Sequence, residues 1–115
     1  MEFLLLIYSP ETSGPQPGTP EFQEMLQGYG KAGEAMIAAN AMRGGNALQD
    51  VATAKCVAVR DGKSTIADGP FAETKEQLGG YYLVDCRDID EALELAALIP
   101  GAQYGRVEVR PIQNF

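Results

Sequence analysis

The sequence predicts a single α+β domain in which an antiparallel sheet carries two helices on one face. The 115 residues suit one domain, 1–115, and 45% hydrophobic with 22% charged residues is the composition of a globular chain. Short apolar segments typical of strands alternate with two longer amphipathic segments typical of helices. Their order is strand–helix–strand, a hairpin, then strand–helix–strand. This is the split βαβ order of the ferredoxin-like plan with an extra hairpin.

The first half of the chain is predicted to hold a strand and a long helix. The short apolar run Phe3–Tyr8 predicts a strand that is apolar on both faces. Residues 9–18, rich in proline and glycine, are expected to form a loop. Thr19 is the predicted N-cap and Pro20 the first helical residue, and we expect the helix to run to about Met42, before a pair of glycines.

Three glycines lie inside this predicted helix, at Gly28, Gly30 and Gly33. Each costs about 1 kcal/mol relative to alanine in a helix interior. Close packing against the sheet would explain Gly33, whereas the sequence offers no reason for the other two. Their spacing matches the Gly-x-Gly-x-x-Gly dinucleotide motif, but that motif must follow a strand directly. Helix begins near Thr19, so we interpret the match as a coincidence.

The middle of the chain is predicted to hold a β-hairpin. After a loop over 43–50, residues 53–60 have the composition of a strand. The dipeptide Asp61-Gly62 is a two-residue turn signal that leads into a second strand at 63–66. The tetrapeptide Asp68-Gly69-Pro70-Phe71 then predicts a further turn.

Another short helix and a strand are expected next. Thr74 with Gln77 resembles a capping box, which predicts one helical turn ended by Gly79-Gly80. The apolar run Tyr81–Cys86 predicts a strand.

The last third of the chain is predicted to form a helix and a strand. Asp88 with Glu91 is a second candidate capping box, and Pro100-Gly101 is expected to stop the helix. Apolar residues at helical spacing supply its buried face: Ala92, Leu93, Leu95, Ala96 and Ile99. Alternation over Arg106–Ile112 then predicts the final strand.

Two helices cover only one face of such a sheet, yet two of its strands are apolar on both faces. These are Phe3–Tyr8 and Tyr81–Val84. An uncovered apolar sheet face is a surface for association. We therefore expect a homodimer that packs sheet against sheet in a dimeric α/β-barrel-like assembly, or one that exchanges strands with the same burial.

Charge and composition exclude several classes of function. Nine basic residues stand against 16 acidic ones, a formal charge of −7, which disfavours binding to nucleic acid or to an anionic membrane surface. The chain has no histidine, and this excludes Ser-His-Asp and Cys-His catalysis as well as histidine–metal sites. We expect no cofactor.

The two cysteines, Cys56 and Cys86, lie in apolar runs and are expected to be reduced thiols in a cytoplasmic protein. Two sulfurs are too few for a cysteine-only zinc site. The acidic residues Asp85, Asp88 and Asp90 are explained better as part of a helix cap than as a metal site. The apolar N-terminus lacks the basic start of a signal peptide, and no run is long enough to cross a membrane.

Arg106, Glu108 and Arg110 are predicted to project from one face of the last strand. They can pair with one another or with an opposing charge. Alternatively, the arginines can hold the carboxylate or phosphate of a small-molecule anion. We place Tyr81 and Phe71 with these three residues in a candidate ligand-binding set.

One long segment carries a specific resemblance to a known family. Residues 68–82, which run from Asp68-Gly69-Pro70-Phe71 to Gly80-Tyr81-Tyr82, resemble the hallmark of the YCII-related, or DGPF-domain, family. Further matches follow the family's order along nearly the whole chain: Phe3–Tyr8, Gly44-Gly45 with Leu48, Val59–Lys63, Asp90–Leu93, Ile99-Pro100 and Val107–Ile112.

The resemblance implies a dimeric ferredoxin-like α+β fold. A histidine–aspartate pair has been suggested to be catalytic in YCII-like proteins, but this chain has no histidine, and Ile99 precedes Pro100 where that branch has an aspartate. DGPF domains also resemble modules that accompany sigma factors, which implies a role in transcriptional regulation. Any sigma factor would then be a separate partner protein.

Two functions therefore stay open. One is a small dimeric ligand-binding or regulatory module. The other is a metal-independent enzyme in which Asp68, beside the dimer cavity, acts as general base with Tyr81 or Arg110 nearby. A structural role for Asp68 in the turn, with Phe71 anchored in the core, is the alternative to catalysis.

Overall fold

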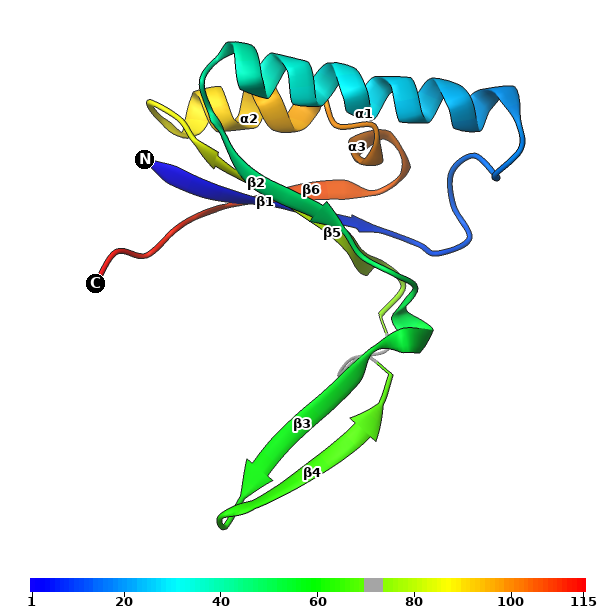
Figure 1. Ribbon diagram of the computed structural model, residues 1–115, viewed down its shortest axis with the longest axis vertical. Coiled ribbons are helices and arrows are strands. Elements are labelled where there is room, and N and C mark those ends of the chain that lie inside the picture. Colours follow the sequence, from blue (N-terminus) through cyan, green and yellow to red (C-terminus); the bar gives the residue numbers. More distant parts are fainter. Residues whose placement is uncertain (70–73) are drawn as a thin grey trace.

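The computed structural model describes residues 1–69 and 74–115 and shows an α+β fold with antiparallel sheets (Figure 1). The elements in chain order are β1 (Glu2–Ser9), α1 (Pro20–Ala38), β2 (Met42–Ala47), a 3₁₀ turn η1 (Val51–Thr53), β3 (Lys55–Arg60), β4 (Lys63–Asp68), β5 (Gln77–Asp85), α2 (Ile89–Ala97), α3 (Gly101–Tyr104) and β6 (Arg106–Pro111).

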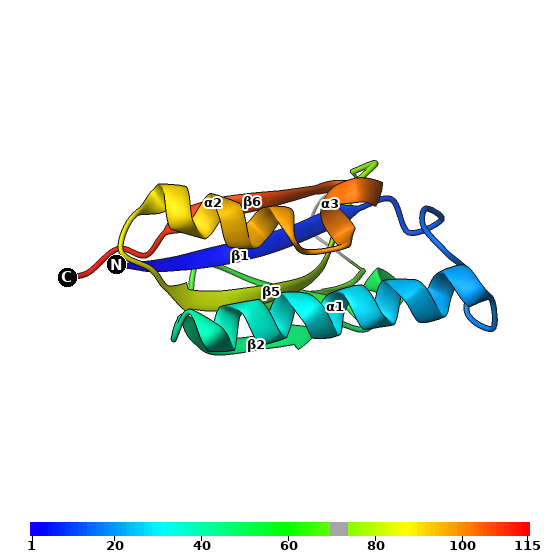
Figure 2. The same cartoon turned by 90° about the horizontal axis from the view of Figure 1, so that it is seen from above.

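Four strands form the main sheet in the order β2-β5-β1-β6, and every neighbouring pair is antiparallel. This order is compatible with the predicted ferredoxin-like plan. Seen from above, α1 lies over β2 and β5, and α2 lies over β1 and β6 (Figure 2). Both helices are therefore on the same face of the sheet.

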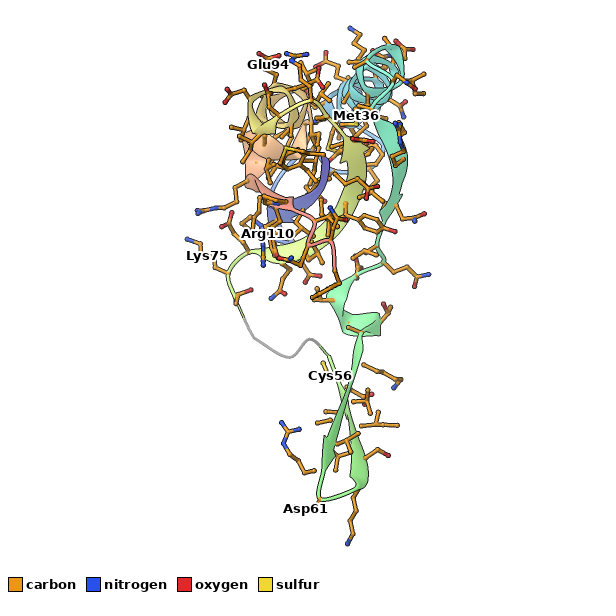
Figure 3. All side chains as sticks on the ribbon, turned by 90° about the vertical axis from the view of Figure 1, so that its left-hand side faces the viewer. Met36, Cys56, Asp61, Lys75, Glu94 and Arg110 are labelled. Atoms are coloured by element: carbon orange, nitrogen blue, oxygen red, sulfur yellow. The ribbon has the colours of Figure 1, made fainter. Side chains whose placement is uncertain are left out.

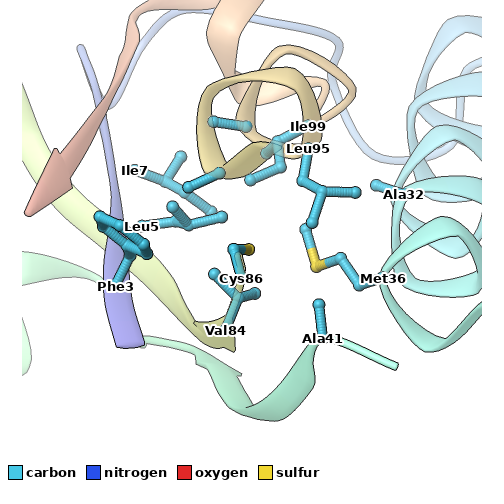
Figure 4. Packing of buried hydrophobic residues seen from close by; sticks show 12 residues of the cluster. Phe3, Leu5, Ile7, Ala32, Met36, Ala41, Val84, Cys86, Leu95 and Ile99 are labelled. Atoms are coloured by element: carbon cyan, nitrogen blue, oxygen red, sulfur yellow. The ribbon is translucent and has the colours of Figure 1, made fainter. Parts of the chain in front are cut away.

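The core lies between the helices and β1. Alternate residues of β1, namely Phe3, Leu5 and Ile7, are buried, while their neighbours are half-buried. These side chains pack with a cluster from α1, β5, α2 and the segment after α2 that includes Met36, Val84, Leu95 and Ile99 (Figure 4). The predicted first strand is thus confirmed.

The first helix begins at the predicted N-cap, where the Thr19 hydroxyl accepts a hydrogen bond from the Phe22 N–H at 3.2 Å. Its predicted end at Met42 is wrong, because α1 ends at Ala38. Asn40 adopts a left-handed conformation with φ 54°, and the Ala41 N–H donates to the Met36 carbonyl at 2.8 Å. This is a Schellman ending with asparagine in the position usually held by glycine.

Residues 42–47, expected to continue the helix and then form a loop, are the edge strand β2. Its sequence, Met-Arg-Gly-Gly-Asn-Ala, carries no strand pattern. Pairing with β5 supplies the hydrogen bonds that make it a strand. The second strand of the sheet is therefore β2 and not the predicted strand 53–60.

The predicted hairpin forms, but it lies outside the main sheet. We call the hairpin β3–β4 the arm (residues 55–68); it is a separate two-stranded sheet that projects away from the helices (Figure 1). Asp61 and Gly62 have φ values of 53° and 75°, the type I′ geometry that suits a two-residue hairpin turn. At the base of the arm, the Gly69 N–H donates to the Ala54 carbonyl at 2.7 Å.

The helical turn predicted at Thr74–Gln77 is wrong. Gln77 begins β5, and Gly79-Gly80, expected to end the turn, lie inside that strand. The Gln77 side-chain amide donates to the main-chain carbonyl of Thr74 at 2.8 Å, and the Thr74 hydroxyl donates to the Glu76 carbonyl, so both side chains stabilise a turn rather than cap a helix. The predicted turn residues Pro70 and Phe71 lie outside the described residues.

The second helix is capped as predicted: the Asp88 carboxylate accepts from the Glu91 N–H at 2.9 Å. It ends at Ala97, before Pro100. The chain then returns to helix for one unpredicted turn, α3, which starts at Gly101.

Close packing was expected at Gly33, but the structure shows it at Gly28 instead. An added Cβ at Gly28 would lie 2.8 Å from Cγ of Pro100, so close packing against the α2–α3 junction explains Gly28. At Gly33, no atom of the described residues outside its two chain neighbours and the nearby backbone of its own helix lies within 4 Å of an added Cβ, so packing does not explain it.

These two glycines make a matched pair for mutation. We expect Gly33→Ala to raise the free energy of unfolding by about 0.5–1 kcal/mol, because alanine is the better helix former and meets no neighbour. Gly28→Ala should lower it by about 1 kcal/mol, because the clash with Pro100 outweighs that gain. Urea denaturation of both variants measures the difference, and equal stabilities would contradict the packing role of Gly28.

Candidate functional site

A cleft of about 570 Å³ opens at one end of the sheet, on the face that carries the helices. It lies between α1, α3, the strands β2 and β5, and the loop that follows β1. The lining residues are Ile7, Ser9, Ser13, Gly14, Pro15, Met25, Leu26, Tyr29, Gly45, Asn46, Ala47, Gly79, Gly80, Tyr81, Tyr82, Gly101 and Tyr104. We call it the tyrosine cleft.

Four tyrosines line the cleft: Tyr29 from α1, Tyr81 and Tyr82 from β5, and Tyr104 from α3. Burial raises the pKa of Tyr29 above its ordinary value, the neighbouring phenol of Tyr82 raises it further, and the backbone of Gly101 lowers it. Burial also raises the pKa of Tyr82. At neutral pH these hydroxyls are therefore protonated and can donate hydrogen bonds.

Glycine at 101 lets α3 approach the sheet closely. A Cβ at Gly101 would lie 2.6 Å from Cγ2 of Ile7 and 3.1 Å from the Tyr29 hydroxyl oxygen. The glycine therefore holds α3, and with it Tyr104, against the inner end of the cleft.

Among the described residues, no charged side chain lines the tyrosine cleft. Its polar groups are the hydroxyls of the tyrosines and of two serines, together with Asn46, whose amide donates to the Tyr81 hydroxyl, and the rest of the lining is apolar. Clefts of this kind suit a largely apolar small molecule held in one orientation by a few hydrogen bonds. The chemistry of the lining thus favours a neutral ligand.

Of the predicted ligand-binding residues that the structure describes, only Tyr81 lines this cleft, and the cleft as a whole was not predicted. Tyr29 was assigned to the apolar face of a helix, while Tyr104 and Ala47 belong to elements that were not predicted. One signal in the sequence could have indicated the cleft: several tyrosines, each with an apolar ring and a polar hydroxyl, lie in or beside apolar segments.

The predicted ligand-binding residues of β6 lie elsewhere, on the face of the sheet away from the helices. We call this surface the open face. Arg106, Glu108 and Arg110 pair in register with Tyr8, Leu6 and Leu4 of β1. Figure 3 shows Arg110 on the side from which the arm projects.

Both arginines of the open face stand near carboxylates. Arg106 forms an ion pair with Glu76 at 2.9 Å, and Arg110 lies 3.9 Å from Glu108. Arg106 also lines a second hollow, with Lys75, Glu76 and Tyr8. Tyr81, which also lines the tyrosine cleft, pairs in register with Leu6 on the open face, and its hydroxyl accepts a hydrogen bond from the Asn46 amide at 3.0 Å.

Asp68 is placed apart from these residues. It is the last residue of β4, its side chain is 83% exposed, and it forms an ion pair across the arm with Lys55. The structure therefore brings Tyr81 and the three β6 residues onto one sheet face, whereas Asp68 belongs to the arm. Phe71, the remaining candidate, lies outside the described residues.

Within 1–69 and 74–115, no three acidic or thiol side chains gather in a group that could hold a metal ion. Asp85 forms an ion pair with Arg43 at 3.6 Å, and Asp88 caps α2. Over the same residues, no helix is long and apolar enough to span a membrane.

The tyrosine pKa shifts predict a loss of stability at high pH. Because the pKa of Tyr29 in the folded protein is above 10.0, folding favours the protonated phenol. The resulting stabilisation is complete below pH 10.0 and is lost as the pH rises through the pKa of Tyr29 in the folded protein. We expect the free energy of unfolding to fall less steeply above pH 10.0 in Tyr29→Phe than in the wild type. Urea denaturation across this range tests it, and parallel curves would contradict the role of Tyr29.

Comparison with known proteins agrees with the resemblance seen in the sequence. The family model of the YCII-related domain matches residues 1–115, the full chain. Over 53 residues the chain is 53% identical to an uncharacterised protein of Rhizobium meliloti (strain 1021), a stretch that covers 44% of this chain and 43% of that protein. The chain therefore spans less than half the length of this relative. Because the family model covers every residue, the chain belongs to the YCII-related domain family.

Proposed function

We propose that this protein is a homodimeric module that binds a small, largely apolar and neutral molecule in the tyrosine cleft. The observation that carries the proposal is the lining of the cleft, with four tyrosines, no charged side chain among the described residues, and a volume of about 570 Å³. That volume is within the range of small-molecule sites. The ligand has an aromatic or aliphatic body and a group that hydrogen-bonds to a phenol.

The open face supports the dimer. Leu4, Leu6 and Tyr8 of β1 and Tyr81 and Leu83 of β5 are half-buried there, and no described helix covers them. A second copy packed on this face would remove these apolar side chains from water. The dimer would keep the tyrosine cleft accessible, because the cleft is on the opposite face of the sheet.

A small anion on the open face is the weaker candidate ligand. Arg106 and Arg110 each have a carboxylate within 4 Å, so an incoming anion must compete with Glu76 or Glu108. The contrast with the uncharged cleft is the reason to favour a neutral ligand.

The enzyme alternative requires Asp68 to be desolvated. In one chain Asp68 is exposed and paired with Lys55, so a second copy would have to bury it before its carboxylate acted as a base at neutral pH. A regulatory module therefore fits better. Its use beside a separate sigma factor is supported by the family resemblance alone.

We also propose the cytoplasm as its location. Both cysteines are free thiols, and burial raises the pKa of Cys86, which keeps that thiol protonated. Such thiols suit a reducing compartment.

Two related probes test the ligand class. We expect the neutral dye N-phenylnaphthylamine to bind more tightly than the anionic anilinonaphthalene sulfonate, because the cleft offers no cation. Leu26→Lys, in the cleft lining, should raise the Kd of the neutral dye about tenfold, since it places a charge in an apolar site. Ile37→Lys, on the same helix but outside the lining, is the control. Fluorescence titration measures all three proteins, and tighter binding of the anionic dye would contradict the proposal.

The dimer is tested separately. Analytical ultracentrifugation should show a dimer for the wild type and for Ile37→Lys, and a monomer for Leu6→Lys, because the lysine would be buried at the centre of the packed open faces. Far-ultraviolet circular dichroism checks that each variant is folded. A monomeric wild type at micromolar concentration would overturn the dimer proposal.

A further inference from the structure

The arm carries a second apolar surface that is far more exposed than the open face. Val57 and Ile66 are directly opposed in the register of β3 and β4, and Val59 lies two residues along on the same face. Their exposed fractions are 68%, 72% and 60%. We call these three residues the arm stripe. The other face carries Cys56, Ala58 and Thr65, so the apolar side chains of greatest size gather on one side.

Few interactions stabilise this hairpin by itself. A two-stranded sheet is marginal in water without packing on one face. The ion pair between Lys55 and Asp68 at its base is exposed and contributes little. A stripe of two valines and an isoleucine on such an element is therefore expected to pack against another surface.

The position of the arm indicates which surface that is. The arm projects from the side of the sheet opposite α1 and α2, the same side as the open face (Figure 1, Figure 3). A second copy packed on the open face would lie beside the arm. With two-fold symmetry, each copy would present its arm to the other in an equivalent way.

Charge points to the same partner. The arm has three basic residues, Lys55, Arg60 and Lys63, against the two acidic residues Asp61 and Asp68, a net charge of +1. Since the whole chain carries −7, the rest of it carries −8. The arm is thus a cationic projection from an acidic protein, and the acidic body of a second copy complements it.

We propose that the arm is a clasp: its stripe of Val57, Val59 and Ile66 packs against the second copy that covers the open face. The inference rests on the proposed homodimer and adds a second contact to it. The clasp would bury the stripe and enlarge the apolar interface beyond the sheet faces.

A matched pair of lysine variants tests the clasp. Ile66→Lys and Ile37→Lys make the same change at side chains of similar exposure, 72% and 67%, the first on the arm and the second on α1. Lysine at position 66 raises the net charge of the arm from +1 to +2, which favours attraction to an acidic partner, so any loss of affinity reports the apolar contact. We expect Ile66→Lys to raise the dimer Kd about 100-fold in sedimentation equilibrium, because the change acts at two equivalent contacts, while Ile37→Lys leaves it unchanged.

Amide hydrogen exchange supplies a second readout on the unmodified protein. Residues 55–68 should be protected in the dimer and lose protection on dilution to the monomer, whereas β1 keeps its protection. If Ile66→Lys dimerises as the wild type does while Leu6→Lys is monomeric, the dimer stands and the clasp is wrong. If the wild type is a monomer, both proposals fail.

Discussion

The protein depends on one constraint: over the residues that the structure describes, the helices cover one face of the four-stranded sheet and leave the other uncovered (Figure 1). Burial of Phe3, Leu5 and Ile7 beneath the helices forms the core, and the alternation of β1 then turns Leu4 and Leu6 toward the other face. Because side chains alternate along a strand, the same run of apolar residues creates both a core and an uncovered surface. The open face and the dimer that we propose on it both follow from that alternation.

The tyrosine cleft arises where the helical layer leaves the end of the sheet uncovered. The long helix α1 reaches past this end, and the single turn α3 closes one side, held near Ile7 by Gly101. A phenol is apolar over most of its surface and polar at its tip, so Tyr29, Tyr82 and Tyr104 give this region an apolar lining with hydrogen-bonding groups. The two faces of the sheet thus have separate roles in our proposals, the helical face for a ligand and the open face for a second copy.

Features encoded within a few consecutive residues were predictable from the sequence. The caps at Thr19 and Asp88 are determined by one side chain and a nearby N–H, and the turn at Asp61-Gly62 by two residues that tolerate positive φ. The early end of α1 also had a local signal, because asparagine at position 40 tolerates positive φ. The prediction relied instead on the glycine pair Gly44-Gly45 and therefore placed the helix end too late. The family match likewise depends on the sequence alone.

The sequence by itself determined the fold class, the strand β1, both helix starts and the hairpin, because each rests on local periodicity or on one capping contact. Only the tertiary structure decided that Met42–Ala47 is a strand and that Gln77 begins β5, since hydrogen bonds to neighbouring strands override weak local preferences. It also separated Asp68 from Tyr81 and assembled the cleft. Those arrangements join segments distant along the chain, and no local pattern specifies which distant segments meet.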